Sequence, residues 1–203
     1  MFKAAEDYCK EKTNNYDESH DWLHHKQVAK NVALIADDER IDPRIRNMLV
    51  MAAWLHDIID HKYVKDINKE IIEMKSFLNR FYTTSESERI ILWINNSSWS
   101  KEKKLGCLPV ADDEQQYARI LADADRLEAI SGTEYNGSPV GIARCKAYSE
   151  MKRPDASPEE ITADVKKHCE EKLLILHEWI FTKSAKKIAI ANTAVIQSWY
   201  DSH

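Results

Sequence analysis

Residues 42–60 read DPRIRNMLVMAAWLHDIID, and this stretch decides the fold. Asp42-Pro43 places a capping residue before a proline at the first helical position, which is typical of a helix start. The apolar residues that follow recur at helical spacing and form an inward stripe that His56 continues: Ile45, Leu49 and Ala52. The stretch therefore predicts a core helix that carries the adjacent pair His56-Asp57 near its end.

The same periodicity predicts helices along the rest of the chain, with few interruptions. Only 4 glycines and 5 prolines occur in 203 residues, which argues against a β-sandwich or barrel rich in tight turns. We predict one all-α domain over residues 1–203, a helical bundle of about seven helices, with a core metal-binding part at 16–130 and C-terminal helices at 140–203. The predicted helices cover 21–38, 42–57, 67–81, a segment opened by a capping box at Ser85–Glu88, 114–130, a long helix after Ser157 that reaches Ile180, and 183–200, with loops at 101–113 and 131–139.

Composition narrows the classes of partner. The formal net charge is -5 and the sequence pI is about 5.9, so no basic face for bulk nucleic acid is expected, although a small anionic substrate remains possible. No signal peptide and no membrane-spanning apolar run is recognisable. The cysteines are widely spaced and form no C-x-x-C pair, so free thiols in a reducing cytoplasm are expected, at Cys9, Cys107, Cys145 and Cys169.

Three polar side chains, His24, His56 and Asp125, occupy positions that helical periodicity reserves for the interior or its edge, and Asp57 lies beside one of them. His24 lies four residues before Val28 on one stripe, and Asp125 lies four residues after Leu121 on another. A single inward histidine is more often a core residue than a ligand. Together with His56-Asp57, however, this set would bury like charges without a counter-charge, at a cost of several kcal/mol. A divalent cation would remove that cost, and imidazole nitrogen with carboxylate oxygen suits manganese, iron, zinc and similar ions.

Several short sequence motifs resemble those of the HD-domain metal-dependent phosphohydrolases, most closely the stand-alone bacterial type of about 200 residues. The resemblance covers nearly the whole chain and rests on the order H…HD…D. The motifs that carry the resemblance are Tyr16, residues 19–24 (SHDWLH), 55–63 (LHDIIDHKY), 123–129 (DADRLEA) and 141–144 (GIAR).

The resemblance implies an all-α bundle that holds one divalent metal ion. Its ligands carry over to His24, His56, Asp57 and Asp125. His25 and Asp123 are the neighbouring alternatives to the first and last of these. Manganese is the expected ion, with magnesium, iron, zinc, nickel or cobalt as alternatives.

Further residues are candidates for functional roles because they lie within or beside these motifs. Asp60 is a candidate to orient or deprotonate the attacking water, or else it caps the turn after the helix. Lys62, Arg126 and Arg144 are candidates for substrate phosphates, with structural salt bridges as the alternative. His20 and Asp21 are candidates to support the metal ligands, and Asp21 is equally a helix cap.

Two departures from the family pattern bear on the substrate. The family usually has arginine three residues after the first ligand, where this chain has Gln27, and residues 131–140 contain an insertion that could reshape the mouth of the site. The resemblance implies hydrolysis of a nucleoside triphosphate or its deoxy form to monophosphate and pyrophosphate, by a monomer or homodimer. A 5′-nucleotidase or phosphodiesterase on the same site, or a non-catalytic regulatory HD domain, are the alternatives.

Overall fold

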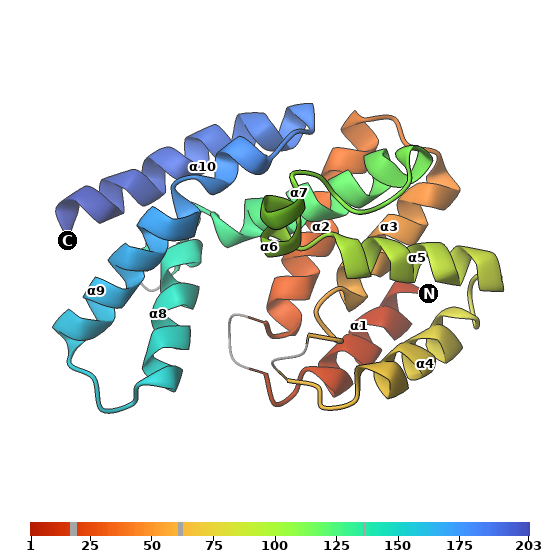
Figure 1. Ribbon diagram of the computed structural model, residues 1–203, viewed down its shortest axis with the longest axis horizontal. Helices are drawn as coiled ribbons and strands as arrows, with labels where there is room; N and C mark the ends of the chain where they lie inside the picture. Colours follow the sequence, from red (N-terminus) through yellow and green to blue (C-terminus); the bar gives the residue numbers. More distant parts are fainter. Residues whose placement is uncertain (17–19, 61–62, 136) are drawn as a thin grey trace.

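The computed structural model describes residues 1–16, 20–60, 63–135 and 137–203, and it is built almost entirely from helices (Figure 1). The all-α prediction is confirmed, although more helices form than the predicted seven. In the described residues the α-helices are α1 (Phe2–Lys12), α2 (Trp22–Asp38), α3 (Pro43–Leu55), α4 (Ile67–Leu78), α5 (Thr84–Asn96), α6 (Trp99–Leu105), α7 (Gln115–Ala129), α8 (Val140–Lys152), α9 (Pro158–His168) and α10 (Lys183–Ser202).

The core of the molecule forms where α2, α3 and α7 pack together, and α1, α4 and α5 cover this group. Helix α3 is buried along its last two turns, from Met48 to Leu55, because its sequence there is apolar on every face. Asp42 caps its start by accepting hydrogen bonds from the backbone N–H groups of Arg44 and Ile45. Helix α3 therefore fixes the position of whatever follows Leu55.

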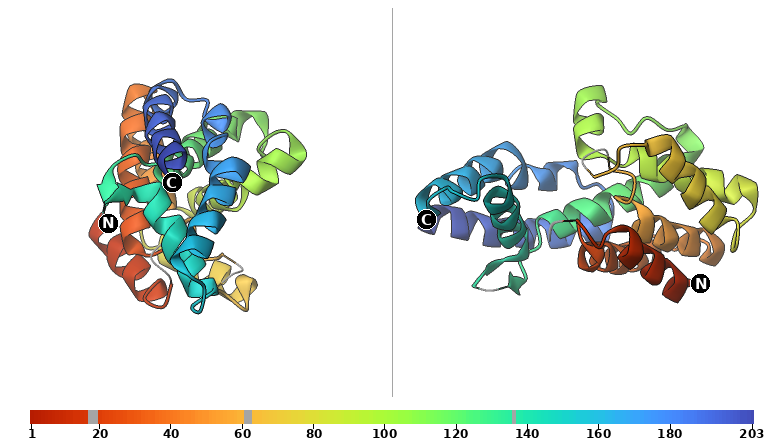
Figure 2. Two further views of the ribbon diagram at one scale, coloured as in Figure 1. Left: turned by 90° about the vertical axis from the view of Figure 1, so that its left-hand side faces the viewer. Right: turned by 90° about the horizontal axis from the view of Figure 1, so that it is seen from below.

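The C-terminal helices form a separate group that projects from this core (Figure 2). Helix α8 packs on α9, and α10 begins beside α7 and runs along the outside of this group to the C-terminus. A short antiparallel hairpin of β1 (Glu134–Tyr135) and β2 (Ser138–Pro139) precedes α8. Gly141 lies so close to the end of α7 that an added Cβ would sit 2.4 Å from the carbonyl oxygen of Ala129. That contact brings the start of α8 against the helix that carries Asp125.

Several predicted boundaries are wrong. The capping box of α5 is Thr83 with Glu86, two residues before the predicted one. Helices α1 and α6 were not predicted, and α6 begins at Trp99 and extends to Leu105, into the predicted loop 101–113. The predicted long helix after Ser157 ends at His168 and continues as the π-helix η2 (Cys169–Leu173) and the 3₁₀ helix η3 (Leu176–Trp179).

Two further findings concern the chain as a whole. Among the described residues, no helix is both long enough and apolar enough to cross a membrane. The four cysteines are unpaired, and Cys9 and Cys169 are buried.

Candidate metal centre

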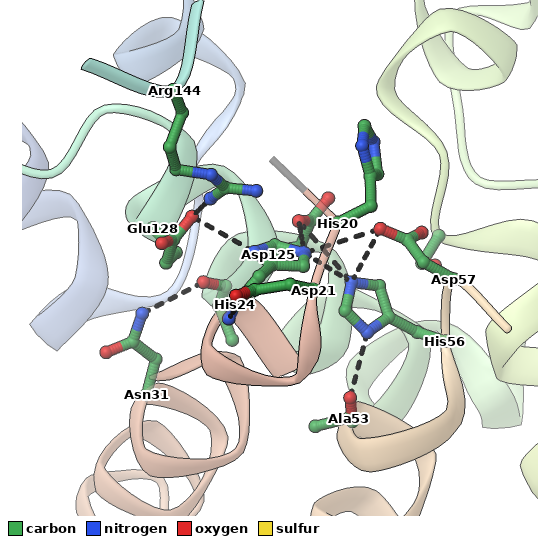
Figure 3. Close-up of polar contacts among 12 residues, drawn as sticks. His20, Asp21, His24, Asn31, Ala53, His56, Asp57, Asp125, Glu128 and Arg144 are labelled. Atoms are coloured by element: carbon green, nitrogen blue, oxygen red, sulfur yellow. Dashed lines mark hydrogen bonds and ion pairs between the residues drawn. The ribbon is translucent and has the colours of Figure 1, made fainter. Parts of the chain in front are cut away.

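Three core helices deliver the four predicted ligands to one place (Figure 3). Asp21 caps α2 by accepting hydrogen bonds from the backbone N–H groups of Leu23 and His24, so His24 falls in the first helical turn. His56 and Asp57 follow the last residue of α3 directly, and Asp125 lies on α7. The helix starts and ends that the sequence encodes thus determine where the polar side chains meet.

Among the described residues, His24, His56 and Asp57 offer ligand atoms that all lie within 4.8 Å of one another, and Asp125 faces both imidazoles beside this group. His24 Nε2 is 3.0 Å from His56 Nε2 and 3.3 Å from Asp57 Oδ2, and His56 Nε2 is 3.4 Å from the same oxygen. Asp125 Oδ1 lies 3.5 Å from His24 Nε2 and 3.6 Å from His56 Nε2. Ligands placed about 2.0–2.2 Å from a metal ion are separated from their neighbours by distances of this size.

The outer nitrogens of the two imidazoles already have acceptors. His24 Nδ1 is 3.1 Å from Glu128 Oε2, and His56 Nδ1 is 2.8 Å from the carbonyl oxygen of Ala53. Each Nδ1 therefore carries its hydrogen and donates it, which directs the Nε2 of each ring into the cluster. Two Nε2 atoms 3.0 Å apart repel each other unless a metal ion, or a proton on one of the rings, lies between their lone pairs. The residues present therefore fit a divalent metal ion.

Electrostatics within the cluster favour a positive charge there, in the form of a metal ion or of a second proton on His56. Burial lowers the pKa of His24 to about 4, helped by the charge of Arg144. Burial acts the same way on His56, but the carboxylates of Asp57 and Asp125 outweigh it and raise the pKa of His56 to about 9. Burial tends to raise the pKa values of Asp57 and Asp125. The neighbouring imidazoles outweigh it, hold the pKa of Asp57 well below its usual range and lower the pKa of Asp125. Both carboxylates are thus ionised and ready to bind a cation.

Glu128 is a further member of the site, and the sequence analysis did not identify it. Its side chain is almost fully buried, accepts the Nδ1–H of His24, and forms an ion pair with Arg144 through the same oxygen. The sequence spacing could have indicated this role, because a residue three positions after Asp125 lies on the same face of α7. Glu128 connects a metal ligand to a cation of α8 and so sets the orientation of the His24 ring.

Replacing Glu128 by glutamine is expected to weaken metal affinity by about 10–100-fold, the usual effect of losing a carboxylate partner of a ligating histidine. The amide keeps the shape but loses the charge that balances Arg144. Manganese titration of the metal-stripped protein, followed by calorimetry, measures the change. Glu39→Gln, on the residue that caps the end of α2 away from the cluster, provides the control. Equal affinity in Glu128→Gln and wild type would contradict this role.

The cluster lies in a cleft of about 990 Å³. His20, Asp60 and Arg144 line the same cleft beside the ligands. His20 Nδ1 is 3.0 Å from the hydroxyl of Tyr63. Asp60 follows the ligand pair by one turn, with its N–H donated to the carbonyl of Asp57. These three side chains therefore face whatever occupies the cleft.

One predicted phosphate contact is wrong. Arg126 is 1% exposed, and its guanidinium donates to Glu102 Oε2 at 2.6 Å and to the carbonyl oxygen of Trp179 at 2.6 Å. It is not among the residues that line the cleft. Successive residues of a helix point about 100° apart, so Arg126 turns away from its neighbour Asp125. Lys62, another predicted phosphate contact, lies outside the described residues.

The two alternative ligands have other surroundings. Asp123 is fully buried, and its Oδ2 accepts the backbone N–H groups of Phe181 and Thr182, just before α10 begins. The ring of His25 is also fully buried, with neither nitrogen hydrogen-bonded, and burial holds its pKa well below the usual value. The structure therefore assigns packing roles to both.

The two departures from the family pattern lie away from the cleft. Gln27 is exposed and donates to Asn31, whose amide in turn donates to the carbonyl oxygen of Ala124. The described residues of 131–140 do not line the cleft, since the hairpin packs against α8 and α10 instead. Asp21 acts as the helix cap, one of its two predicted roles.

Comparison with known proteins identifies relatives of this chain by sequence and by structure. No family model matches the chain. YpgQ of Bacillus subtilis is 31% identical over 171 residues, which span 84% of this chain and 76% of YpgQ. The crystal structure of YpgQ in complex with ADP has a TM-score of 0.73 at 23% identity, over 100% of this chain and 95% of that one.

Two other crystal structures share the fold. A Lactobacillus plantarum protein has a TM-score of 0.76 at 26% identity, over 98% of this chain and 93% of that one. An HD-superfamily hydrolase from Bacillus thuringiensis has a TM-score of 0.69 at 22% identity, over 98% of this chain and 93% of that one. The chain therefore belongs to the family that includes YpgQ, and it shares its fold with an HD-superfamily hydrolase.

Proposed function

We propose that the protein is a metal-dependent phosphohydrolase that cleaves a nucleoside triphosphate, or its deoxy form, to the monophosphate and pyrophosphate. The observation that carries the proposal is the pair of Nε2 atoms, 3.0 Å apart, flanked by two carboxylates with lowered pKa values at the wall of a large cleft. The ADP complex of YpgQ supports a nucleotide as the ligand. The cleft, at about 990 Å³, lies at the upper end of the size range of small-molecule sites.

His24, His56, Asp57 and Asp125 would hold the ion, with manganese as the first choice. The bound ion would supply Lewis acidity, polarising a phosphoryl oxygen and lowering the pKa of a water molecule. Arg144 reaches the cleft from α8 and can orient a phosphate with a forked pair of N–H donors. Glu128 holds both Arg144 and His24 in place. Lys62 remains a proposed phosphate contact.

Asp60 is the residue that we assign as general base. It lines the cleft one turn beyond the ligand pair, so its carboxylate faces the space where water and phosphate would meet. The water oxygen forms a bond to the α-phosphorus while the bond from that phosphorus to the bridging oxygen breaks. Asp60 accepts a proton from the water, and pyrophosphate leaves with the bridging oxygen.

The test is a product analysis with the metal-stripped protein. Nucleoside mono-, di- and triphosphates are incubated with and without added manganese, and the released phosphate species is identified. Pyrophosphate released from triphosphates only when manganese is present is the expected result. Orthophosphate from monophosphates would instead establish a nucleotidase. No turnover, despite metal binding, would overturn the proposal in favour of a regulatory domain.

A further inference from the structure

One face of α8 forms a continuous wall of the cleft. Arg144, Tyr148 and Lys152 follow one another at intervals of four residues, and all three line the cavity. Arg144 contacts Glu128 beside the metal cluster, so this end of the wall is fixed. Lys152 lies eight residues further on, about 12 Å along the helix axis. The cleft therefore extends well beyond the cluster, along α8.

Four lysines line this cleft, and three of them are considered first: Lys101 of α6, Lys152 of α8 and Lys172 of η2. Lys101 donates to the carbonyl oxygen of Asn95 at 2.9 Å. Lys152 lies over the ring of Tyr148 at 5.5 Å, and Lys172 over that of Trp99 at 5.9 Å. Within the part of the chain that the structure describes, no carboxylate forms an ion pair with any of the three.

The other cations of the far end of the cleft are already neutralised. Arg153 pairs with Asp164 at 2.6 Å, and Lys167 pairs with Glu171 at 3.8 Å. Among the described residues, the contrast separates three lysines without a carboxylate partner from two cations that each have one. Unbalanced positive charge that converges on one cavity attracts anions.

The π-helix η2 contributes directly to this arrangement. It interrupts the helical register after α9, and His168, Glu171, Lys172 and Leu173 then all border the cleft. A π-helical turn widens the helix by one residue and changes the direction of the side chains after it, which is common at functional sites. In this protein the turn brings Lys172 to the wall opposite α6.

We infer that Lys101, Lys152 and Lys172 form a subsite for the polyphosphate end of the substrate, the part that leaves as pyrophosphate. This inference rests on the proposed function, because it names the end of the triphosphate that each part of the cleft binds. The metal end is rich in carboxylates, with Asp57, Asp60 and Asp125, and tolerates phosphate only where a cation compensates. The lysine end carries the opposite charge and binds phosphate without a metal ion.

The lysine subsite makes the protein selective for the number of phosphates in its substrate. A triphosphate reaches both ends of the cleft, whereas a monophosphate reaches only the metal end. Lysine ammonium groups act as point charges, so the subsite recognises phosphate charge and not the base. The lysines are substrate-binding residues, and their removal should raise KM for triphosphates with little change in kcat.

The test uses inorganic triphosphate as the probe, titrated by calorimetry into the full-length, metal-stripped protein in the presence of a chelator. The variant carries Lys101→Ala, Lys152→Ala and Lys172→Ala. A matched control carries Lys30→Ala, Lys104→Ala and Lys187→Ala, which are exposed, lie outside the cleft, and lower the net charge equally. Circular dichroism of both proteins, and the three single variants, exclude misfolding as the cause.

The wild type and the control should bind inorganic triphosphate more tightly than orthophosphate, and the cleft variant should lose at least about tenfold in affinity. Equal affinity in the cleft variant and the control would overturn the subsite. Turnover of nucleotides is measured in parallel, so that the two proposals fail separately. If no nucleotide is cleaved but the cleft variant loses binding, the subsite stands and the proposed reaction fails. If triphosphates are cleaved with unchanged KM in the cleft variant, the subsite fails and the reaction stands.

Discussion

Asp57→Ala should reduce nucleotide hydrolysis to the background rate while leaving the helical content unchanged. Asp57 Oδ2 lies 3.3–3.4 Å from both Nε2 atoms, so its removal takes away the carboxylate that faces both imidazoles. The two Nε2 lone pairs then lack part of the charge that makes a divalent ion favourable. Initial rates with saturating manganese, compared with the wild type, measure the loss.

The matched control for this variant is Asp38→Ala, an exposed carboxylate at the end of α2 that is not among the cleft residues. It removes the same charge and should retain full activity. Circular dichroism of both variants checks that the fold is intact, since Asp57 follows α3 and is not part of its helical turns. Activity that survives in Asp57→Ala with metal removed would contradict the account.

Glu102→Ala should lower the free energy of unfolding by about 3–5 kcal/mol, the usual cost of breaking a buried ion pair from one side. Glu102 is 2% exposed, and its two oxygens accept from Arg119 and from Arg126 Nη2, the latter at 2.6 Å. Removing it leaves the fully buried Arg126 without its carboxylate. Urea denaturation followed by circular dichroism gives the change.

The control for this prediction is Glu88→Ala. Glu88 forms an exposed ion pair with Lys75, which is worth about 0–1 kcal/mol.

The pH dependence of the free energy of unfolding gives a second check on Glu102. Burial tends to raise the pKa of Glu102, but Arg119 and Arg126 hold it below the usual value. Its contribution to stability is therefore present above the unfolded-state pKa and is lost as the pH falls through the lower folded-state pKa. Equal stability of Glu102→Ala and Glu88→Ala would contradict the assignment.

Local patterns predict the inward direction of His24, His56 and Asp125, because each of these continues a helical stripe, whereas Asp57 was predicted from its adjacency to His56 and from the family resemblance. Helix α3 begins at its Asp42 cap and directs His56 inward along the same face as Leu49 and Ala52. Helix α2 directs His24 inward by the same rule. Periodicity also explains the error at Arg126, because proximity in sequence to Asp125 does not give it the same direction on a helix. The helical direction of each residue is thus more informative than its distance along the chain.

Contacts between distant segments could not be predicted from one sequence. Glu102 meets Arg126 across 24 residues, and this pair requires α6 to form in a stretch without apolar periodicity. Lys172 enters the cleft only because a π-helical turn follows α9, and no local signal predicts that turn. Glu128 is an intermediate case. Its spacing from Asp125 suggests a shared face, but only the structure shows that it connects His24 with Arg144.

His24, His56, Asp57 and Asp125 are expected to hold one divalent ion together. Anomalous X-ray scattering at the manganese edge, from crystals of the protein grown with Mn²⁺, locates that ion. We expect a single strong peak about 2.0–2.3 Å from the two Nε2 atoms and from one oxygen of each carboxylate. A peak that lies elsewhere, or no peak in crystals that still diffract with the cluster ordered, would contradict it.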